Sequence, residues 1–436
     1  MTSRVFYLIS LVFLVTASLT AQRAPQSSAG PEAELKFVVY VSRHGVRSPT
    51  GKPELYNTYS NAAWPTWEVA PGYLTAHGYR LMELFGAYDR LKLASQGLLS
   101  STGCEDAAHV TIYADSDQRT RETGKALAAG LFPGCTLAVK ALPEGEADPL
   151  FHTIHAGVAQ PDSALATAAI SGRIGGDANN LTGVYRTQIT ALDKILANCG
   201  NPIAREAKRI SLLEIPAKLA PGRNNQQAQL GGPLNTASTL TENILLEYTQ
   251  GMNASNVGWG CVDGENLRTL MELHTAASDF TRRTTVIART DASNLLDHIR
   301  RAIEQSVTGK QVSGAPNLPS DRALFLIGHD TNLANIAGLL NLNWILDGRR
   351  DDTPPGGVLI FELWKTRATE SYSVRTYYSA QTLEQMRSAS NLTLGNPPQR
   401  VQVFLPGCSQ QELACSWSSF SESLRQAVDP RYVDSR

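Results

Sequence analysis

Residues 36–50, KFVVYVSRHGVRSPT, join a buried strand to a cluster of ionisable side chains. The first half of this stretch, Lys36 to Ser42, is almost continuously apolar, which is typical of a strand covered on both faces. Two later runs, Val110 to Ala114 and Ala323 to Ile327, have the same character. Because helical patterns follow these runs closely, we expect an α/β fold with a mainly parallel sheet flanked by helices.

The helices expected around the sheet follow from apolar periodicity and from stop signals. Gln118 to Leu131 has a helical pattern that stops at Pro133-Gly134, and a further helix fits Thr75 to Leu99. Thr331 to Leu340 is also helix-like, and the Thr331 hydroxyl is able to cap it. Near the C-terminus we expect two more strands, at residues 358–364 and 374–378.

The middle of the chain differs from both ends, because residues 162–283 contain helical runs and almost no strand signal. The helices expected there are 183–198, 238–250 and 265–282, and residues 221–227 read as a loop. We therefore expect an α/β core built from residues 32–161 and 284–436. A mainly helical domain, residues 162–283, would be inserted between its strands.

The N-terminus is expected to be a signal peptide covering residues 1–21. Arg4 precedes an apolar stretch of about 15 residues, Val5 to Leu19, and a small residue, Ala21, lies near the expected cleavage point. An uncleaved membrane anchor is the alternative, but the stretch is shorter than the ~20 residues that span a bilayer. We therefore expect a periplasmic or secreted protein.

Charge and cysteine content narrow the possible partners. Lys plus Arg total 39 against 40 Asp plus Glu, so nothing overall suggests nucleic acid or an anionic membrane as partner. We expect a monomer.

The six cysteines of an exported chain suggest disulfides. Cys408 with Cys415 and Cys104 with Cys135 are natural pairs, whereas Cys199 with Cys261 follows only by elimination and is left open.

All three predicted core strands run into ionisable residues. The first leads to Arg43, His44 and Arg47, the second to Asp115 and Arg119, and the third to His329 and Asp330. Ligand sites of open α/β sheets form outside the carboxyl ends of the strands. If the three strands are neighbours, these side chains form one site.

Such a site suits a phosphoryl group. The guanidinium groups of Arg43, Arg47 and Arg119 match phosphate oxygens and would stabilise charge in the transition state. A neutral His44 imidazole is a competent nucleophile, and neighbouring Arg charges disfavour its protonated form. Asp330 opens a helix and could protonate the leaving oxygen. No cofactor and no metal ion is expected, because no His/Cys cluster has zinc spacing.

These motifs resemble the histidine acid phosphatases of the phosphoglycerate-mutase-like superfamily, close to the bacterial periplasmic phytases of the enterobacterial type. The resemblance rests on Arg43-His44-Gly45-x-Arg47-x-Pro49 together with His329-Asp330, and it covers nearly the whole mature chain. It implies that His44 forms a phosphohistidine and that Asp330 donates the proton. It also implies that the phosphate is held by Arg43, Arg47, Arg119 and His329.

The resemblance further implies a substrate pocket that includes Thr50, Asp115, Met252 and Thr331. One position departs from the pattern of these phytases, which carry Lys directly after the residue matching Thr50. Here Gly51 stands at that position and Lys52 follows it. The expected substrate is myo-inositol hexakisphosphate. The replacement of the usual Lys by Gly51 removes one side chain that would contact this substrate in the phytases of this type.

Two other functions stay open. A sugar phosphatase such as a glucose-1-phosphatase would share the catalytic residues, although Thr331-Asn332 resembles phytases more. A non-catalytic phosphoester-binding protein would have lost the nucleophile or the acid, and both are present. Among the other histidines, His274 is a weaker candidate for facing the cleft, and His152 has no motif around it.

Overall fold

The computed structural model describes residues 33–203 and 208–434, so the expected signal peptide, residues 1–21, lies outside the described residues. In the described part of the chain, no helix combines the length and the apolar character needed to cross a bilayer.

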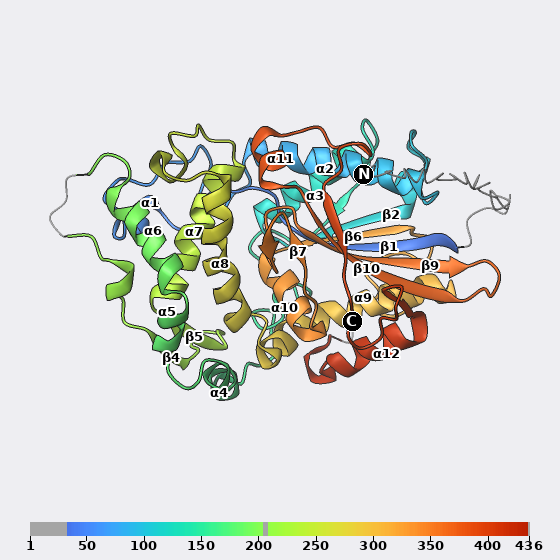
Figure 1. The fold of residues 1–436 in the computed structure, drawn as a ribbon. Helices are drawn as coiled ribbons and strands as arrows, with labels where there is room; N and C mark the ends of the chain where they lie inside the picture. Colours follow the sequence, from blue (N-terminus) through green and yellow to red (C-terminus); the bar gives the residue numbers. More distant parts are fainter. Residues whose placement is uncertain (1–32, 204–207, 435–436) are drawn as a thin grey trace, which may run out of the picture. The chain divides into compact units, whose positions relative to one another are not determined.

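The three predicted core strands are direct neighbours in one mixed sheet (Figure 1). β6 (Ala323–Gly328) lies between β1 (Ala33–Arg43) and β2 (Val110–Ala114), and both pairings are parallel. β3 (Val139–Lys140) extends this parallel half beyond β2. On the other side of β1, β9 (Val358–Thr366) begins an antiparallel half. That half continues through β10 (Tyr372–Ala380), β11 (Gln399–Gln402) and β12 (Ala414–Ser416).

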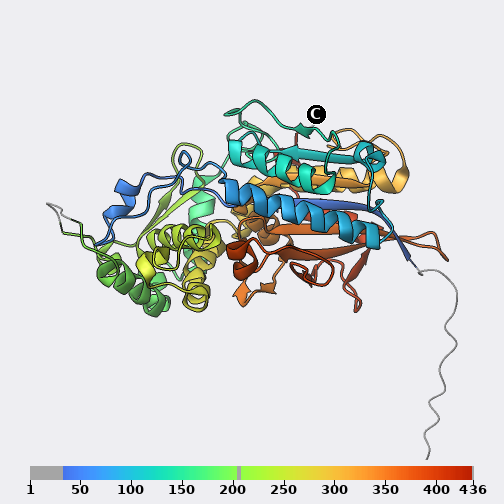
Figure 2. The same cartoon turned by 90° about the horizontal axis from the view of Figure 1, so that it is seen from above.

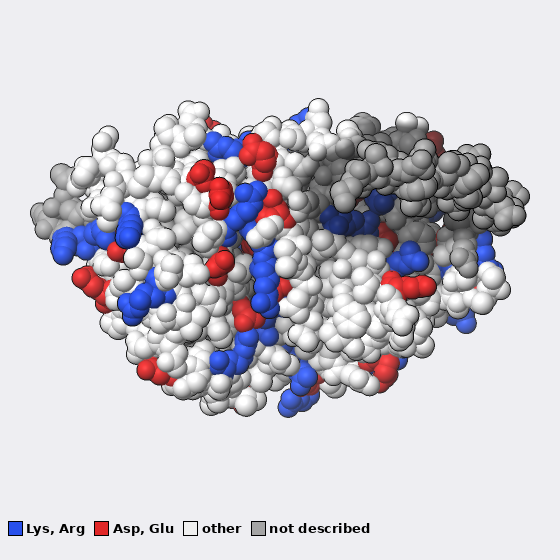
Figure 3. All heavy atoms as spheres, in the orientation of Figure 1, with Lys and Arg blue, Asp and Glu red and all other residues white. Residues whose placement is uncertain are grey.

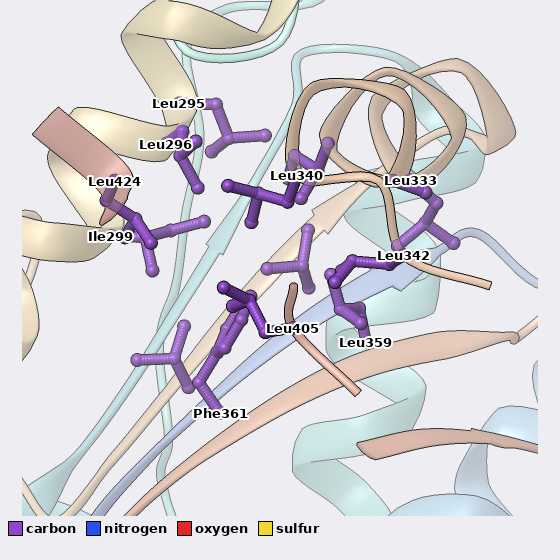
Figure 4. Close-up of a cluster of buried hydrophobic side chains, with 14 of the residues drawn as sticks. Leu295, Leu296, Ile299, Leu333, Leu340, Leu342, Leu359, Phe361, Leu405 and Leu424 are labelled. Atoms are coloured by element: carbon purple, nitrogen blue, oxygen red, sulfur yellow. The ribbon is translucent and has the colours of Figure 1, made fainter. Parts of the chain in front are cut away.

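Helices cover both faces of the sheet because its central strands are apolar on both sides. From β1, Val38 and Tyr40 pack with α2 (Ala76–Ser95) and α3 (Gln118–Leu131). The alternate residues Val39 and Val41 pack with three helices on the opposite face (Figures 1 and 2). These helices are α9 (Thr285–Thr308), α10 (Asp330–Leu340) and α12 (Trp417–Ala427). Figure 4 shows leucines of α9 and α10 meeting Leu359 and Phe361 of β9 in this second core.

The predicted helices form, with differences at their ends. α3 has the predicted bounds, whereas α2 ends at Ser95, just before Gly97, whose φ of 76° is unfavourable for other residues. The expectation that Thr331 caps α10 was wrong. The helix begins one residue earlier with His329 as its N-cap, and the Asn332 side chain accepts a hydrogen bond from the His329 N–H.

The middle of the chain is mainly helical and has its own apolar core. Its helices are α4 (Ser163–Arg173), α5 (Asn179–Val184), α6 (Arg186–Asn198), α7 (Pro233–Thr249) and α8 (Gly264–Thr281). Residues 221–227, predicted as a loop, connect a short hairpin of β4 (Lys218–Pro221) and β5 (Ala228–Gly231). The predicted boundaries of an inserted domain at residues 162 and 283 remain a proposal.

All six cysteines are paired. The structure contains Cys104–Cys135 and Cys408–Cys415, as predicted, and it also contains Cys199–Cys261, the pair left open by the sequence. Cys199 follows α6 and Cys261 precedes α8, so this third bond links the end of α6 to the start of α8.

Candidate active site

The register of the sheet brings the predicted site residues together. Arg43 pairs with Gly328 at the ends of β1 and β6, and Ala114 of β2 pairs with Ile327. The chain therefore leaves three adjacent strands at the same edge. His44, Arg119 and Asp330 all follow these strand ends, on the loop after β1 and in the first turns of α3 and α10.

His44 is held as a neutral imidazole with one free nitrogen. Its side chain is 1% exposed. Nδ1 lies 2.8 Å from the carbonyl oxygen of Gly45, and since a carbonyl only accepts, Nδ1 carries the proton. Nε2 is thereby left with its lone pair. Burial lowers the pKa of His44 well below its usual range, and the charges of Arg43 and Arg119 lower it further.

Gly45 is required by close packing. A Cβ at this position would come within 2.8 Å of the Met82 side chain and 3.0 Å of the Gly78 carbonyl oxygen, both on α2. The Gly45 N–H donates to the Thr123 hydroxyl of α3 at 2.9 Å. The turn that carries His44 is therefore fixed against two helices of the core.

Two of the predicted phosphate-binding arginines share one carboxylate. Arg43, buried at 1% exposure, forms an ion pair with Glu242 of α7 and donates to the Thr353 carbonyl at 2.6 Å. Arg47 lies 3.9 Å from the same Glu242 oxygen. Burial lowers the pKa of Arg47 to about 10, and Arg43 contributes to this shift although Glu242 opposes it. Arg47 therefore remains charged in acid.

The third arginine lies beside His329. Arg119 forms an ion pair with Asp117, and its guanidinium lies 3.4 Å from Nδ1 of His329. The opposite nitrogen, Nε2 of His329, donates to the buried Asp115 carboxylate at 2.6 Å. His152 donates to the same Asp115 oxygen at 2.9 Å. Asp115 thus orients two imidazoles, of which one faces Arg119.

Asp330 lies among positive charges. Burial alone would raise its pKa, but Arg282, Arg43 and other cations hold the pKa of this carboxyl well below its usual range. The nearest atom of Arg282, Nη2, is 3.8 Å from Oδ2 of Asp330. The free site therefore favours an ionised Asp330, and only added negative charge would favour its protonated form.

Two adjoining cavities open at this edge of the sheet. One, the Arg-lined cavity, has a volume of about 230 Å³ and is lined by Arg47, Glu242, His274, Arg282 and Asp330 among others. The second, the amide-lined cavity, has a volume of about 460 Å³ and five Asn or Gln side chains from residues 225–235 in its wall. Asn235, Thr281 and Arg282 line both.

The predicted pocket residues are distributed unevenly around these cavities. Thr50 lines the Arg-lined cavity and Thr331 lines the amide-lined one. Asp115 is fully buried and accepts a hydrogen bond from His329, whereas Met252 is not among the residues lining either cavity and packs against the helical core. Their roles toward a substrate stay predictions.

Sequence reasoning missed Glu242, Arg282 and His152. Glu242 is one of several polar residues of α7, with Asn243 and Glu247 close to it in the chain, and no local motif marks it. Arg282 is the C-cap of α8, and basic side chains are common near the C-terminal ends of helices whether or not they have a function. His152 has no motif around it either, yet the fold places it beside Asp115. His274, the weaker candidate, does line the Arg-lined cavity.

Four side chains close to Arg119 have the spacing of metal ligands. Ligand atoms of Asp115, Asp117, His152 and His329 lie within 4.8 Å of one another. Asp115 Oδ2 already accepts two imidazole N–H groups, and Asp117 pairs with Arg119. These contacts connect the four residues to each other and to the arginine cluster.

Surface charge is mixed on the face seen in Figure 3. Basic side chains there stand in a narrow column with acidic ones beside them. Ion pairs such as Arg268–Asp347 and Arg283–Asp351 join α8 and its C-terminal end to the segment after α10.

Comparison with known proteins gives a consistent result. The family model described as histidine phosphatase superfamily (branch 2) matches residues 34–379. Phytase AppA of Escherichia coli K12 is 39% identical over 425 residues, which cover 95% of this chain and 97% of that protein. A glucose-1-phosphatase of Providencia rettgeri is 28% identical, covering 96% and 99%. The structure of a Hafnia alvei phytase with myo-inositol hexakis sulphate matches with a TM-score of 0.84 and 35% identity, covering 93% and 100%.

Proposed function

This chain belongs to the histidine phosphatase superfamily (branch 2), and we propose that it is an exported acid phosphatase whose substrate is myo-inositol hexakisphosphate. Three observations support the substrate: the 39% identity to a phytase, the fold similarity to another, and a site rich in arginine. The three disulfides support export, because such bonds persist in oxidising compartments.

The observation that carries the catalytic proposal is the state of His44. Its Nδ1–H is donated to the Gly45 carbonyl, so Nε2 is the nucleophile. Arg43, Arg47 and Arg119 would hold the phosphoryl group and stabilise its equatorial oxygens. His329, whose ring is fixed by Asp115, would hold it as well through Nδ1, because a bound phosphate dianion favours protonation of that nitrogen.

The reaction would proceed in two displacements. In the first, a bond forms between His44 Nε2 and phosphorus while the phosphorus–oxygen bond to the leaving group breaks. Asp330 gives its proton to the departing oxygen. In the second, water attacks the phosphohistidine, Asp330 takes the proton from water, and orthophosphate leaves with His44 neutral again.

The negative charge of the substrate would prepare the acid for this step. A phosphate dianion close to Asp330 offsets the pull of Arg282 and Arg43, and so raises the pKa of the carboxyl from its low value in the free site. Protonated Asp330 would thus be favoured only where substrate is bound.

The test is a substrate panel at several pH values, comparing myo-inositol hexakisphosphate, glucose 1-phosphate, p-nitrophenyl phosphate and a nucleotide. We expect hexakisphosphate to have the highest kcat/KM in acid. A preference for glucose 1-phosphate would favour the second candidate, to which the 28% identical glucose-1-phosphatase points. Absence of turnover on every ester would contradict catalysis and favour a phosphoester-binding protein.

A further inference from the structure

Arg282 occupies the junction between the two cavities. It follows the last turn of α8 as its C-cap, and its side chain lines both the Arg-lined and the amide-lined cavity. Its side chain is 32% exposed, so a ligand in either cavity can reach it.

The guanidinium of Arg282 lacks a close partner among the described residues. The 3.8 Å separation from Asp330 is too long for a hydrogen bond, and Nη1 is buried without any hydrogen-bond partner in the described structure. The amide-lined cavity also contains a carboxyl group, that of Asp291, whose charge would oppose anion binding. Burial raises the pKa of Asp291 to about 6. In mild acid Asp291 is therefore mostly neutral and adds little negative charge to the cavity.

The amide-lined cavity has the composition of a site for a polar, anionic group. Asn225, Gln226, Gln227, Gln229 and Asn235 supply amide groups to its wall. His152 lies in the same wall and donates a hydrogen bond to Asp115. The wall is therefore rich in side chains that can donate hydrogen bonds to an anion.

We propose that Arg282 binds a second phosphate group of the substrate, lodged at the mouth of the amide-lined cavity while a first phosphate occupies the arginine cluster. This inference rests on the proposed function, since it requires a substrate with several phosphates. It makes Arg282 a specificity-determining residue that distinguishes multiply phosphorylated esters from simple monoesters.

The experiment measures inhibition constants with p-nitrophenyl phosphate as the reporter substrate. Orthophosphate reports on the first site alone, and myo-inositol hexakis sulphate reports on both. In Arg282→Gln we expect the inhibition constant of the hexakis sulphate to rise by about tenfold to hundredfold, the range of a lost charge-assisted hydrogen bond. The constant for orthophosphate should change far less. Arg282→Lys, which keeps the charge but loses the planar fork, should lie between wild type and Arg282→Gln.

Arg186→Gln is the matched control, because it removes the same charge from an exposed position at the start of α6. It should leave both constants at their wild-type values. If the ratio of the hexakis sulphate constant to the orthophosphate constant is unchanged in Arg282→Gln, the proposal is overturned. If Arg282→Gln does not fold, Arg282→Lys replaces it, and an unchanged ratio in that variant overturns the proposal.

The outcome is separable from the proposed function. If the wild-type enzyme does not turn over hexakisphosphate but Arg282 still governs binding of the hexakis sulphate, the assigned substrate is wrong and the second anion site stands. If hexakisphosphate is the best substrate and the ratio is unaffected by Arg282, the assigned function stands and this inference falls.

Discussion

Arg43 at the end of β1 forms a buried ion pair with Glu242 of α7, although 199 residues separate them in the chain. The Glu242 carboxylate, which comes from the helical middle of the chain, therefore contacts two of the arginines that would hold the phosphate. It keeps Arg43 charged and in place, and it also repels the anion that Arg43 would bind.

Glu242→Gln tests this double role. The variant should lower the free energy of unfolding by about 2 kcal/mol, because a buried arginine loses its counter-charge while an amide oxygen remains to accept its hydrogen bond. Orthophosphate should inhibit the variant more strongly, since one nearby negative charge is gone. Denaturant unfolding and product inhibition measure the two effects. Unchanged stability together with weaker inhibition would contradict both parts of this role for Glu242.

His44→Ala should abolish turnover while binding of orthophosphate persists on the arginine cluster. After acid quench, the wild-type enzyme should carry a phosphoryl label that is labile to acid and stable to base, as expected of a phosphohistidine. The same label in His44→Ala, or an acid-stable one in the wild type, would assign the nucleophile to another residue.

Asp330→Asn should slow esters with poor leaving groups far more than p-nitrophenyl phosphate, whose leaving oxygen needs little protonation. A comparison of kcat on hexakisphosphate and p-nitrophenyl phosphate measures the difference. An equal loss on both would remove Asp330 from the role of proton donor.

The rate should have an acidic optimum with two limbs. His44 must be neutral, and its lowered pKa keeps it neutral in mild acid, so activity is lost only as pH falls through that value. Asp330 must be protonated; bound phosphate raises its pKa from the low value that the arginines impose in the free site, and activity is lost as pH rises through this raised value. The two limbs belong to the interacting groups together rather than to either residue alone. An optimum of kcat above neutrality would be incompatible with this pair of groups.

Stability should also be greater in acid, through Glu247 of α7. Burial raises the pKa of this carboxyl to about 8, although the hydrogen bond that it accepts from the Gly258 N–H opposes the shift. The pKa of Glu247 is higher in the folded protein than in the unfolded chain. The contribution of Glu247 to the free energy of unfolding is therefore fully present below about pH 4.5 and decreases toward pH 8, by up to about 1.4 kcal/mol per pH unit. In Glu247→Gln the decline between pH 5 and pH 8 should be shallower. Parallel stability profiles for the two proteins would show that Glu247 is not the cause.

Turnover should not require a divalent metal, because arginines supply the charge stabilisation in the proposed mechanism. EDTA is the test, and its result also bears on the group formed by Asp115, Asp117, His152 and His329. Loss of activity with EDTA and recovery with zinc or magnesium would replace the arginine-based mechanism with a metal-based one.

What the sequence predicted well was local. The strands at Val38 and Leu324 and the motif at His44 are each encoded within a few residues, and parallel pairing places their ends together. Glu242, Arg282 and His152 could not be found in this way, because each reaches the site only through packing of distant segments. α9 was also missed, although its residues face the second core and Gly309, in the left-handed conformation, marks its C-terminal end.

The Cys199–Cys261 bond closes a segment that contains both β4–β5 and α7, the helix that carries Glu242. A protease that cuts the chain once between these cysteines would therefore produce two polypeptides that stay covalently joined. Glu242 would remain tethered to its arginine partners after such a nick, and reassembly would be an intramolecular event. In an oxidising compartment, where disulfides persist, this bond would help to preserve the active site after such a cut in a way that its ion pairs alone would not.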